Sequence, residues 1–180
     1  MARVEYRLSF PIYLTNILPP GPGVPVALPG AFPHNPGLYI ILNQNNPQEN
    51  RYMGISNDLR QRFSERQGVC YDLGFAQAIL NGIYAFIGTM RYCSEGDRVW
   101  SNPVGYVAGV LNIVLDGYSY DLEHLFIKAV QHTWPYGTIT NTRKVGTLYN
   151  LGAYPINVDI YWNNGGYHQG VIIPVGGNLI

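Results

Sequence analysis

A hairpin-then-helix pattern in the first half of the chain places the strongest limits on its fold. Residues 37–42 and 51–55 are strand-like, and the polar link 43–50 between them is long enough for a generous hairpin loop. Ser56 can then cap a helix, with Asp58 in the first turn, where the helix dipole favours an acid. The pattern predicts a β-hairpin that leads directly into a helix.

The predicted helix has two distinct faces. Leu59 and Phe63 are four residues apart, so we expect them to face the core together. Arg62 and Arg66 share a different face. The geometry of that second face suits the binding of phosphate.

The N-terminal residues alternate between apolar and other side chains. Residues 4–14 have the period of a half-buried strand, and Pro11 places that strand at a sheet edge or ends it early. Residues 15–36 contain seven prolines, so they cannot be helical and are expected to extend over the surface as an arm. The apolar positions of the strand are Val4, Tyr6, Leu8, Phe10, Ile12 and Leu14.

The next segment has apolar residues at helical spacing. Asp72 can cap this second helix and Gly88 would end it, whereas residues 89–105 look irregular. The apolar positions of the helix are Ala76, Ile79, Leu80, Ile83, Tyr84 and Ile87.

A short strand and a third helix are predicted after that. Residues 110–115 have the composition of a buried strand, which ends at Asp116 and Gly117. Ser119 can cap the following helix, and the run that starts at Pro135 closes it. The apolar stripe of this helix comprises Leu122, Leu125, Phe126, Ala129 and Val130.

The C-terminal part reads as a second hairpin. Residues 156–162 and 167–175 are strand-like, and the Asn-Asn-Gly-Gly run 163–166 between them is a strong hairpin signal. This hairpin could pair with the N-terminal strand, mediate dimerisation or form part of a nucleic-acid cleft. The sequence does not choose among the three.

Length and composition favour one folded α+β domain. The chain has 180 residues and only 12% are charged, which fits a loop-rich globular domain better than disorder. We expect a strand and a proline-rich arm in 1–36, a core in 37–145 and a hairpin extension of the same domain in 146–180.

The formal net charge is zero, which counts against binding to a polyanion, since a basic field normally supplies affinity and encounter rate. The charges are unevenly distributed, however. One stretch contains Arg51, Arg60, Arg62 and Arg66, with only Asp58 and Glu65 against them. A local cluster of arginines can bind a polyanion even when the net charge of the protein is zero.

The sequence has no apolar run near its first residues and no segment with the roughly 20 apolar residues of a membrane span, so neither a classical signal peptide nor a membrane partner is expected. Cys70 and Cys93 are too few and too far apart for a zinc pattern or a disulfide framework. We expect two reduced thiols in a cytoplasmic protein. The alternative is a toxin domain exported without a classical signal peptide.

The tyrosine segments of the first hairpin carry a family resemblance. Gly37-Leu38-Tyr39-Ile40 and Arg51-Tyr52-Met53-Gly54 are followed by Asn57-Asp58-Leu59-Arg60-Gln61-Arg62-Phe63. This order resembles the GIY-YIG nucleases, in which two tripeptides lie on a β-hairpin and an arginine follows ten residues after the second tyrosine. The resemblance implies a core of β-hairpin, helix, third strand and helix, with an extra segment before the third strand.

The resemblance also implies a catalytic constellation. Tyr39, Tyr52, Arg62, Glu123 and Asn141 would be the catalytic residues. Glu123 would hold one Mg²⁺ or Mn²⁺ ion that polarises the scissile phosphate. Tyr39 would take a proton from the attacking water while Tyr52 orients that water, and Arg62 would neutralise charge on the phosphoryl oxygens. Arg60, Arg66 and Lys144 are the cations expected to bind the substrate.

The chain departs from the family pattern around the general base. Tyrosine has a pKa near 10, so Tyr39 needs nearby positive charge to act at neutral pH. Many relatives have a lysine where this chain has Ile55, so Arg60 or Arg66 would have to supply that charge. Arg66 itself stands where many relatives have histidine or tyrosine.

Three readings follow from these residues. The first is a nuclease that acts on DNA rather than RNA, either a restriction-type enzyme or an antibacterial toxin domain with an immunity protein as partner. A homodimer is one arrangement of either. The second is a non-catalytic β-rich module that binds carbohydrate or nucleic acid through tyrosine faces. The third is a GIY-YIG fold that has lost activity, which the intact Tyr39, Tyr52, Arg62 and Glu123 argue against.

Other chemistries fit less well. The four histidines make no HExxH pair, because His124 and His132 are eight residues apart. Asp121 and Glu123 point to different sides of a helix, and Leu125 stands where a paired-carboxylate nuclease would have lysine. The glycines near the N-terminus lack the strand and helix that a phosphate-binding loop needs.

Overall fold

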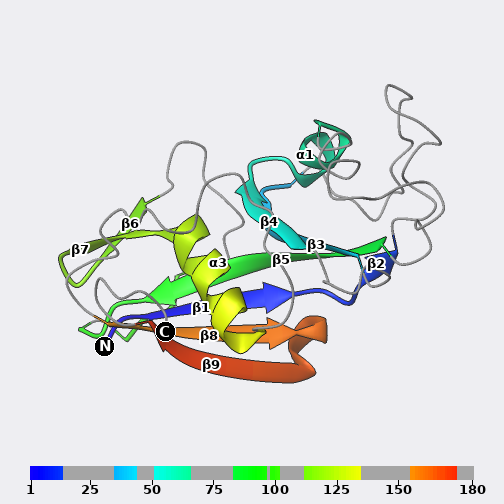
Figure 1. Ribbon diagram of the computed structural model, residues 1–180. Coiled ribbons are helices and arrows are strands. Elements are labelled where there is room, and N and C mark those ends of the chain that lie inside the picture. Colours follow the sequence, from blue (N-terminus) through cyan, green and yellow to red (C-terminus); the bar gives the residue numbers. More distant parts are fainter. Residues whose placement is uncertain are drawn as a thin grey trace.

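The structure, a computed structural model, describes residues 1–13, 35–43, 51–65, 83–96, 98–101, 112–134 and 155–173. Over these residues the chain is α+β, with mostly strands and two α-helices (Figure 1), so the expected fold class is confirmed at this level. The elements are β1 (Arg3–Leu8), β2 (Ile12–Tyr13), β3 (Gly37–Asn43), β4 (Arg51–Ser56), α1 (Leu59–Glu65), β5 (Ile83–Cys93), β6 (Asn112–Leu115), β7 (Tyr118–Asp121), α3 (Leu122–Thr133), β8 (Ile156–Trp162), the 3-10 turn η2 (Asn163–Gly165) and β9 (Tyr167–Ile173).

One mixed sheet organises the fold. Its strand order is β4-β3-β5-β1-β8-β9, with β2 also paired to β5, while β6 and β7 form a separate two-stranded ladder. All neighbouring strands are antiparallel except β1 and β8, which are parallel. Figure 1 shows β1, in blue, between β5 in green and β8 in orange.

The N-terminal strand lies inside the sheet rather than at its edge. Val4, Tyr6 and Leu8 are buried, as their alternation predicts. The strand ends at Leu8, so the early end expected from the following proline is confirmed and the edge placement is wrong. Phe10 was expected on the same buried face but is 60% exposed, because the ladder is interrupted before it.

The C-terminal hairpin is confirmed. Strands β8 and β9 pair from Ile156 to Ile173, and the turn between them has positive φ at Asn163, Asn164 and Gly165, a conformation that Asn and Gly tolerate best. Strand β8 also pairs with β1. Of the three roles left open for this hairpin, pairing with the N-terminal strand is therefore observed.

The second helix is predicted wrongly where the structure describes it, since residues 83–93 form the long strand β5. Its first half pairs with β3 and its second half with β1, and the unbroken apolar run 83–87 satisfies a helical spacing as well as a strand spacing. A Cβ on Gly88 would lie 2.1 Å from the Arg7 carbonyl oxygen. Gly88 therefore allows two backbones to approach within the sheet and does not end a helix. Residues 72–82 lie outside the described residues.

The third helix starts later than predicted. Residues 112–115 form a strand as expected, and Asp116 and Gly117, both with positive φ, make a tight turn into β7. Ser119 pairs with Val114 in this ladder, so it cannot be the helix cap. Asp121 caps α3 instead, and its carboxylate accepts a hydrogen bond from the His124 amide at 3.0 Å.

Helix α3 covers one face of the sheet. Its predicted apolar stripe is buried, and the Phe126 ring packs against Tyr6 of β1 with centroids 4.9 Å apart. The core on this face also takes side chains from β3, β4, β8 and β9. Among the described residues no helix is long and apolar enough to cross a membrane.

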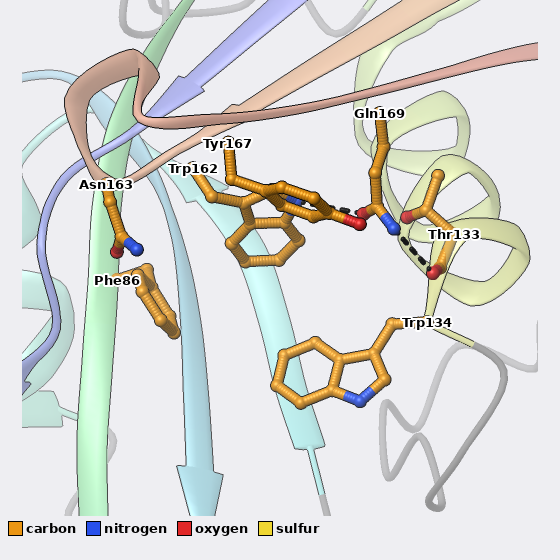
Figure 2. Close-up of a pocket in the computed structure, with 7 residues that line it drawn as sticks. All are labelled: Phe86, Thr133, Trp134, Trp162, Asn163, Tyr167 and Gln169. Carbon is orange, nitrogen blue, oxygen red and sulfur yellow. Dashed lines mark hydrogen bonds between the residues drawn. The ribbon is translucent and has the colours of Figure 1, made fainter.

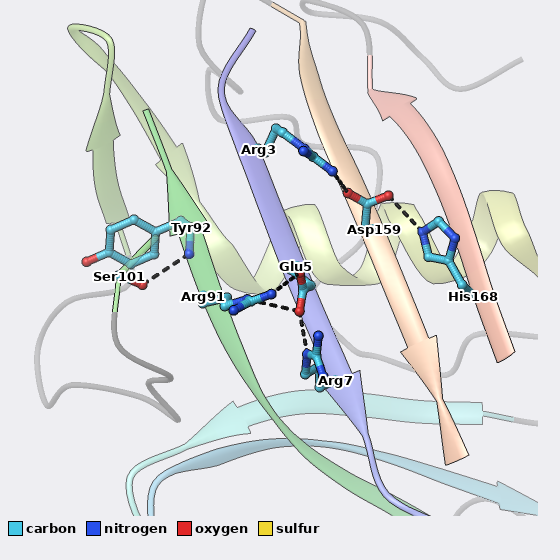
Figure 3. A network of polar contacts seen from close by, with 8 residues as sticks. All are labelled: Arg3, Glu5, Arg7, Arg91, Tyr92, Ser101, Asp159 and His168. Carbon is cyan, nitrogen blue, oxygen red and sulfur yellow. Dashed lines mark hydrogen bonds and ion pairs between the residues drawn. The ribbon is translucent and has the colours of Figure 1, made fainter. Parts of the chain in front are cut away.

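A polar network occupies the opposite face of β1 (Figure 3). Glu5 is buried and accepts hydrogen bonds from Arg91 of β5 and from Arg7. Burial opposes ionisation of Glu5, but the bonds from the two arginines outweigh it, so the pKa of Glu5 lies below its ordinary value. On the other side of β1, Asp159 of β8 contacts Arg3 at 3.0 Å and His168 of β9 at 2.8 Å.

Candidate active site

Tyr39 and Gly54 lie directly opposite each other in the first hairpin. They are paired in the ladder between β3 and β4, so the tyrosine side chain and the empty side-chain position of the glycine share one face. The Tyr39 hydroxyl lies 2.9 Å from the point that a Cβ on Gly54 would occupy. The absence of a side chain at Gly54 is thus what lets the phenol extend over β4.

Glu123 reaches the same point from α3. Its Oε1 atom lies 3.0 Å from the Cβ position of Gly54, as close as the Tyr39 hydroxyl. Strand β4 is the last strand of the sheet, so this meeting takes place at the sheet edge. Two of the predicted catalytic residues, Tyr39 and Glu123, which are 84 positions apart in the chain, therefore meet above Gly54. Glu123 is half-buried there.

Two contacts fix the start of α3 and so the position of Glu123. Asp121, the residue before the helix, caps its first turn. The Tyr6 hydroxyl donates a hydrogen bond to the Leu122 carbonyl at 3.0 Å. Burial first, and then the nearby charge of Asp121, raise the pKa of Tyr6 well above its ordinary value, so this hydroxyl remains a donor at any physiological pH.

Tyr52 lies beside the pair on the same face, because it is two residues from Gly54 along β4. The rings of Tyr52 and Tyr39 are 6.1 Å apart and tilted by 33°. Their side chains are 8% and 2% exposed. Three of the predicted catalytic residues are thus brought together in a largely buried cluster, which we call the Tyr39–Glu123 cluster and define as Tyr39, Tyr52, Gly54 and Glu123.

Helix α1 packs against the strand that carries Tyr39. A Cβ on Gly37 would lie 2.6 Å from the Leu59 side chain, and Gly37 shares a face with Tyr39, so α1 covers that face. Leu59 is buried, as predicted, whereas the side chain of Phe63 lies outside the described ones. Arg60 and Arg62 project from this helix and are half-buried.

The start of α1 differs slightly from the prediction. The helix begins at Leu59, and the Asp58 carboxylate accepts a hydrogen bond from the Gln61 amide at 2.9 Å, so Asp58 is the cap. The Ser56 hydroxyl, which was expected to cap the helix, accepts from the Asp58 amide at 3.2 Å and braces the turn before it.

Arg51 has a different role from the other arginines of its stretch. It is 1% exposed, donates to the Trp134 carbonyl at 2.7 Å and lies over the Trp134 ring at 4.9 Å. The grouping of Arg51 with the arginines that meet a polyanion is therefore wrong. Its charge is directed at the C-terminal end of α3, where the helix dipole favours a cation.

Three predicted residues lie outside the described residues: Asn141, Arg66 and Lys144. The structure bears on neither the catalytic role expected for Asn141 nor the substrate-binding role expected for the two cations. Of the two cysteines, Cys93 is a buried free thiol and Cys70 also lies outside the described residues.

The donor set of the Tyr39–Glu123 cluster suits a hard cation. The carboxylate of Glu123 and the tyrosine hydroxyls are oxygen donors, which Mg²⁺ and Mn²⁺ prefer, and Mg²⁺ commonly binds through one or two carboxylates with waters. Within the described part of the chain no group of three or more His, Cys, Asp and Glu side chains could hold a metal ion. Glu123 is thus the residue of this cluster that could bind one.

Sequence reasoning missed the residues that position this site. Tyr6 appeared only as one member of an alternating strand, although a buried tyrosine hydroxyl requires a partner and so signals a polar contact. Gly54 was recognised as part of a motif but not as the space in which two side chains meet. No signal in the sequence marks Arg51 as buried.

Comparison with known proteins adds nothing to this geometry. No family model, curated protein or solved structure matches this chain.

Proposed function

We propose that this chain is a metal-dependent endonuclease that hydrolyses phosphodiester bonds of DNA, with a core organised as in the GIY-YIG nucleases. One observation carries the proposal: the Tyr39 hydroxyl and the Glu123 carboxylate both lie within contact distance of the same point above Gly54. A phenol beside a carboxylate combines a group that can move a proton with a group that can bind a cation.

Each residue has a distinct part in the proposed reaction. Tyr39, as its phenolate, accepts a proton from the attacking water and becomes the neutral phenol, and Tyr52, whose ring lies 6.1 Å away, orients that water. Arg62 on α1 binds the phosphoryl oxygens, where its permanent charge offsets the charge that develops in the transition state. Glu123 would hold a Mg²⁺ or Mn²⁺ ion, which would supply Lewis-acid polarisation of the phosphate.

The test is cleavage of supercoiled plasmid by the purified protein with Mg²⁺, with Mn²⁺ and with EDTA. Glu123→Gln keeps the shape of the side chain and removes its charge, so we expect it to abolish nicking. Glu95→Gln is the matched control, because Glu95 is an exposed carboxylate that pairs with the N-terminal amine. Nicking by Glu123→Gln at the wild-type rate would refute the site assignment.

A second variant tests the phosphate-binding role. Arg62→Ala should lower the turnover number by about 10²- to 10³-fold, on the order of 2.7–4 kcal/mol of transition-state stabilisation. The exposed Arg98, changed to Ala, serves as the control. Equal activities of the two variants would remove Arg62 from the mechanism.

The products decide between the remaining alternatives. Discrete fragments indicate a restriction-type enzyme, and a smear indicates a toxin-like activity. An absence of cleavage on DNA and on RNA with either metal would favour the non-catalytic binding module. Helices α1 and α3 argue against one form of that module, the β-sandwich lectin, because that fold is built from strands and contains neither helix.

A further inference from the structure

A pocket of about 280 Å³ lies at the end of α3 that is remote from Glu123 (Figure 2). It is formed where the last turn of the helix meets β5 and the hairpin of β8 and β9. Four of its lining residues are aromatic and three are neutral polar residues. The lining comprises Phe86, Thr133, Trp134, Trp162, Asn163, Tyr167 and Gln169.

The aromatic rings are arranged around Trp162. Phe86 and Trp134 both stand edge-on to the Trp162 indole, at interplanar angles of 80° and centroid distances of 5.3 and 5.7 Å. Figure 2 shows these two rings on different sides of Trp162, and Tyr167 is the cross-strand partner of Trp162. Tyr167 is 55% exposed, so its ring is accessible from solvent at the pocket.

The polar groups are few and mostly fixed. Gln169 accepts a hydrogen bond from the Trp162 indole nitrogen and donates one to the Thr133 carbonyl, both at 3.1 Å, so its amide is held in one orientation. The Asn163 side-chain oxygen is buried and has no hydrogen-bond partner among the described residues.

We infer that this pocket binds a nucleobase. A nucleobase has two apolar faces that stack on aromatic rings and a short polar edge that needs few partners. The residues seen to line the pocket include no charged side chain, which fits a neutral ring. A monosaccharide fits less well, because its many hydroxyl groups would be buried against four aromatic rings with few free polar partners.

The inference rests on the proposed function, since a base in this pocket would belong to the strand that is cleaved. Glu123 and Trp134 are eleven residues apart along and just past α3, which corresponds to roughly 16 Å of helix. At about 3.4 Å per stacked nucleotide, this is on the order of five steps. A base recognised here would lie several nucleotides from the cleaved bond and would give the enzyme sequence preference.

The experiment is a titration in EDTA, where no cleavage is expected, that follows quenching of tryptophan fluorescence. The probes are the four nucleoside monophosphates, a single-stranded oligonucleotide, a duplex of the same sequence and methyl glucoside. We expect saturable quenching by at least one nucleotide and none by the sugar. Tighter binding of the single strand than of the mononucleotide would identify a base within a strand, and equal binding would identify a free nucleotide as the ligand.

Tyr167→Ala provides the mutational arm, because an exposed ring can be removed without opening the core. Loss of one base–aromatic stack should weaken binding roughly 5- to 150-fold. Phe10→Ala, at an exposed ring outside the pocket, is the control and should bind as the wild type does. Equal weakening in both variants, no quenching by any nucleotide, or quenching by the sugar alone would overturn the inference.

Plasmid cleavage separates this inference from the proposed function. Nucleotide binding that depends on Tyr167, in a protein that cleaves nothing, would uphold the pocket and refute the nuclease. Cleavage that is insensitive to Tyr167→Ala, in a protein that binds no nucleotide, would refute the pocket and leave the nuclease intact.

Discussion

The glycine of the second tyrosine segment determines how closely two functional groups can approach. Gly54 faces Tyr39 across the ladder, and its missing side chain leaves the space in which the Tyr39 hydroxyl and the Glu123 carboxylate meet. Any other residue would place a carbon atom between them. At the scale of single residues, the candidate site therefore depends on an absence of atoms at position 54.

Gly54→Ala tests this dependence. The new methyl group would lie 2.9 Å from the Tyr39 oxygen and 3.0 Å from Glu123 Oε1, so both flexible ends must move. A displacement near 1 Å can cost about 10²-fold in rate and the shifts needed here are smaller, so we expect plasmid cleavage to fall by up to about 10²-fold while the melting temperature changes little.

Gly96→Ala is the matched control, because a Cβ there would meet no atom within 4 Å. It should cleave as the wild type does. Full activity of Gly54→Ala would show that the meeting of Tyr39 and Glu123 has no part in catalysis.

Tyr39, Tyr52 and Glu123 were predicted through the resemblance to the GIY-YIG nucleases, which their order and the types of their elements carry. The burial of Arg51 was not predicted, since its charge and its neighbours resemble those of Arg60 and Arg62. The difference arises from Trp134, which is 83 residues away and offers Arg51 both a carbonyl and a ring. Such a partner is invisible in the local sequence.

At the scale of elements, α3 is attached to the sheet at both ends. Tyr6 of β1 donates to the Leu122 carbonyl at the start, and Arg51 of β4 donates to the Trp134 carbonyl at the end. The first attachment lies next to Glu123 and the second lies at the aromatic pocket. The helix therefore sets the distance between the two candidate sites.

Tyr6→Phe removes the first attachment. The Leu122 carbonyl would lose this partner in a buried place, so the free energy of unfolding should fall by about 1–3 kcal/mol. Urea denaturation measures the change. Tyr92→Phe, in the partly exposed neighbour on β5, is the control and should be close to neutral. Equal stability of Tyr6→Phe and the wild type would mean that packing alone holds the helix start.

The long strand β5 is the element that the sequence pattern predicted wrongly. Strand β5 carries Ala85, Phe86 and Met90, all buried, and is paired to β3 on one side and to β1 and β2 on the other. A continuous apolar run satisfies a helical spacing as well as a strand spacing. The strands of the two predicted hairpins are confirmed, and the turn of the C-terminal hairpin carries the local signal that predicted it.

At the scale of the whole molecule, β1 joins the two halves of the sheet. It pairs with β5 towards the candidate active site and with β8 towards the C-terminal hairpin. The carboxylates of Glu5 and Asp159 lie along this junction with arginines from two strands (Figure 3). Charge pairing therefore accompanies the strand pairing at the centre of the sheet.

The pH dependence of unfolding should report on this junction. The pKa of Glu5 is lowered in the folded protein, so its contribution to stability is present above its ordinary pKa of 4.5 and is lost as the pH falls through the lower folded value. We expect Glu5→Gln to lower the free energy of unfolding at pH 7 by about 1.5–3 kcal/mol. The difference from the wild type should shrink below pH 4.5.

Thermal melts at pH 7 and at several acid pH values measure both effects. Glu95→Gln is the control, because its exposed pair with the N-terminal amine should contribute at most about 1 kcal/mol. A loss in Glu5→Gln that stays constant with pH would show that its charge does not stabilise the sheet.

The sequence by itself determined the features that local signals control: the α+β class, the strands of the two predicted hairpins, the turn of the C-terminal hairpin, and the buried faces of β1 and α3. Tertiary structure alone decided the rest. Four features depend on partners many residues away: the position of β1 inside the sheet, the strand conformation of β5, the burial of Arg51 and the meeting of Tyr39 with Glu123. Backbone pairing and side-chain packing between distant segments leave no periodic trace in either segment, which is the physical reason that the sequence pattern could not supply them.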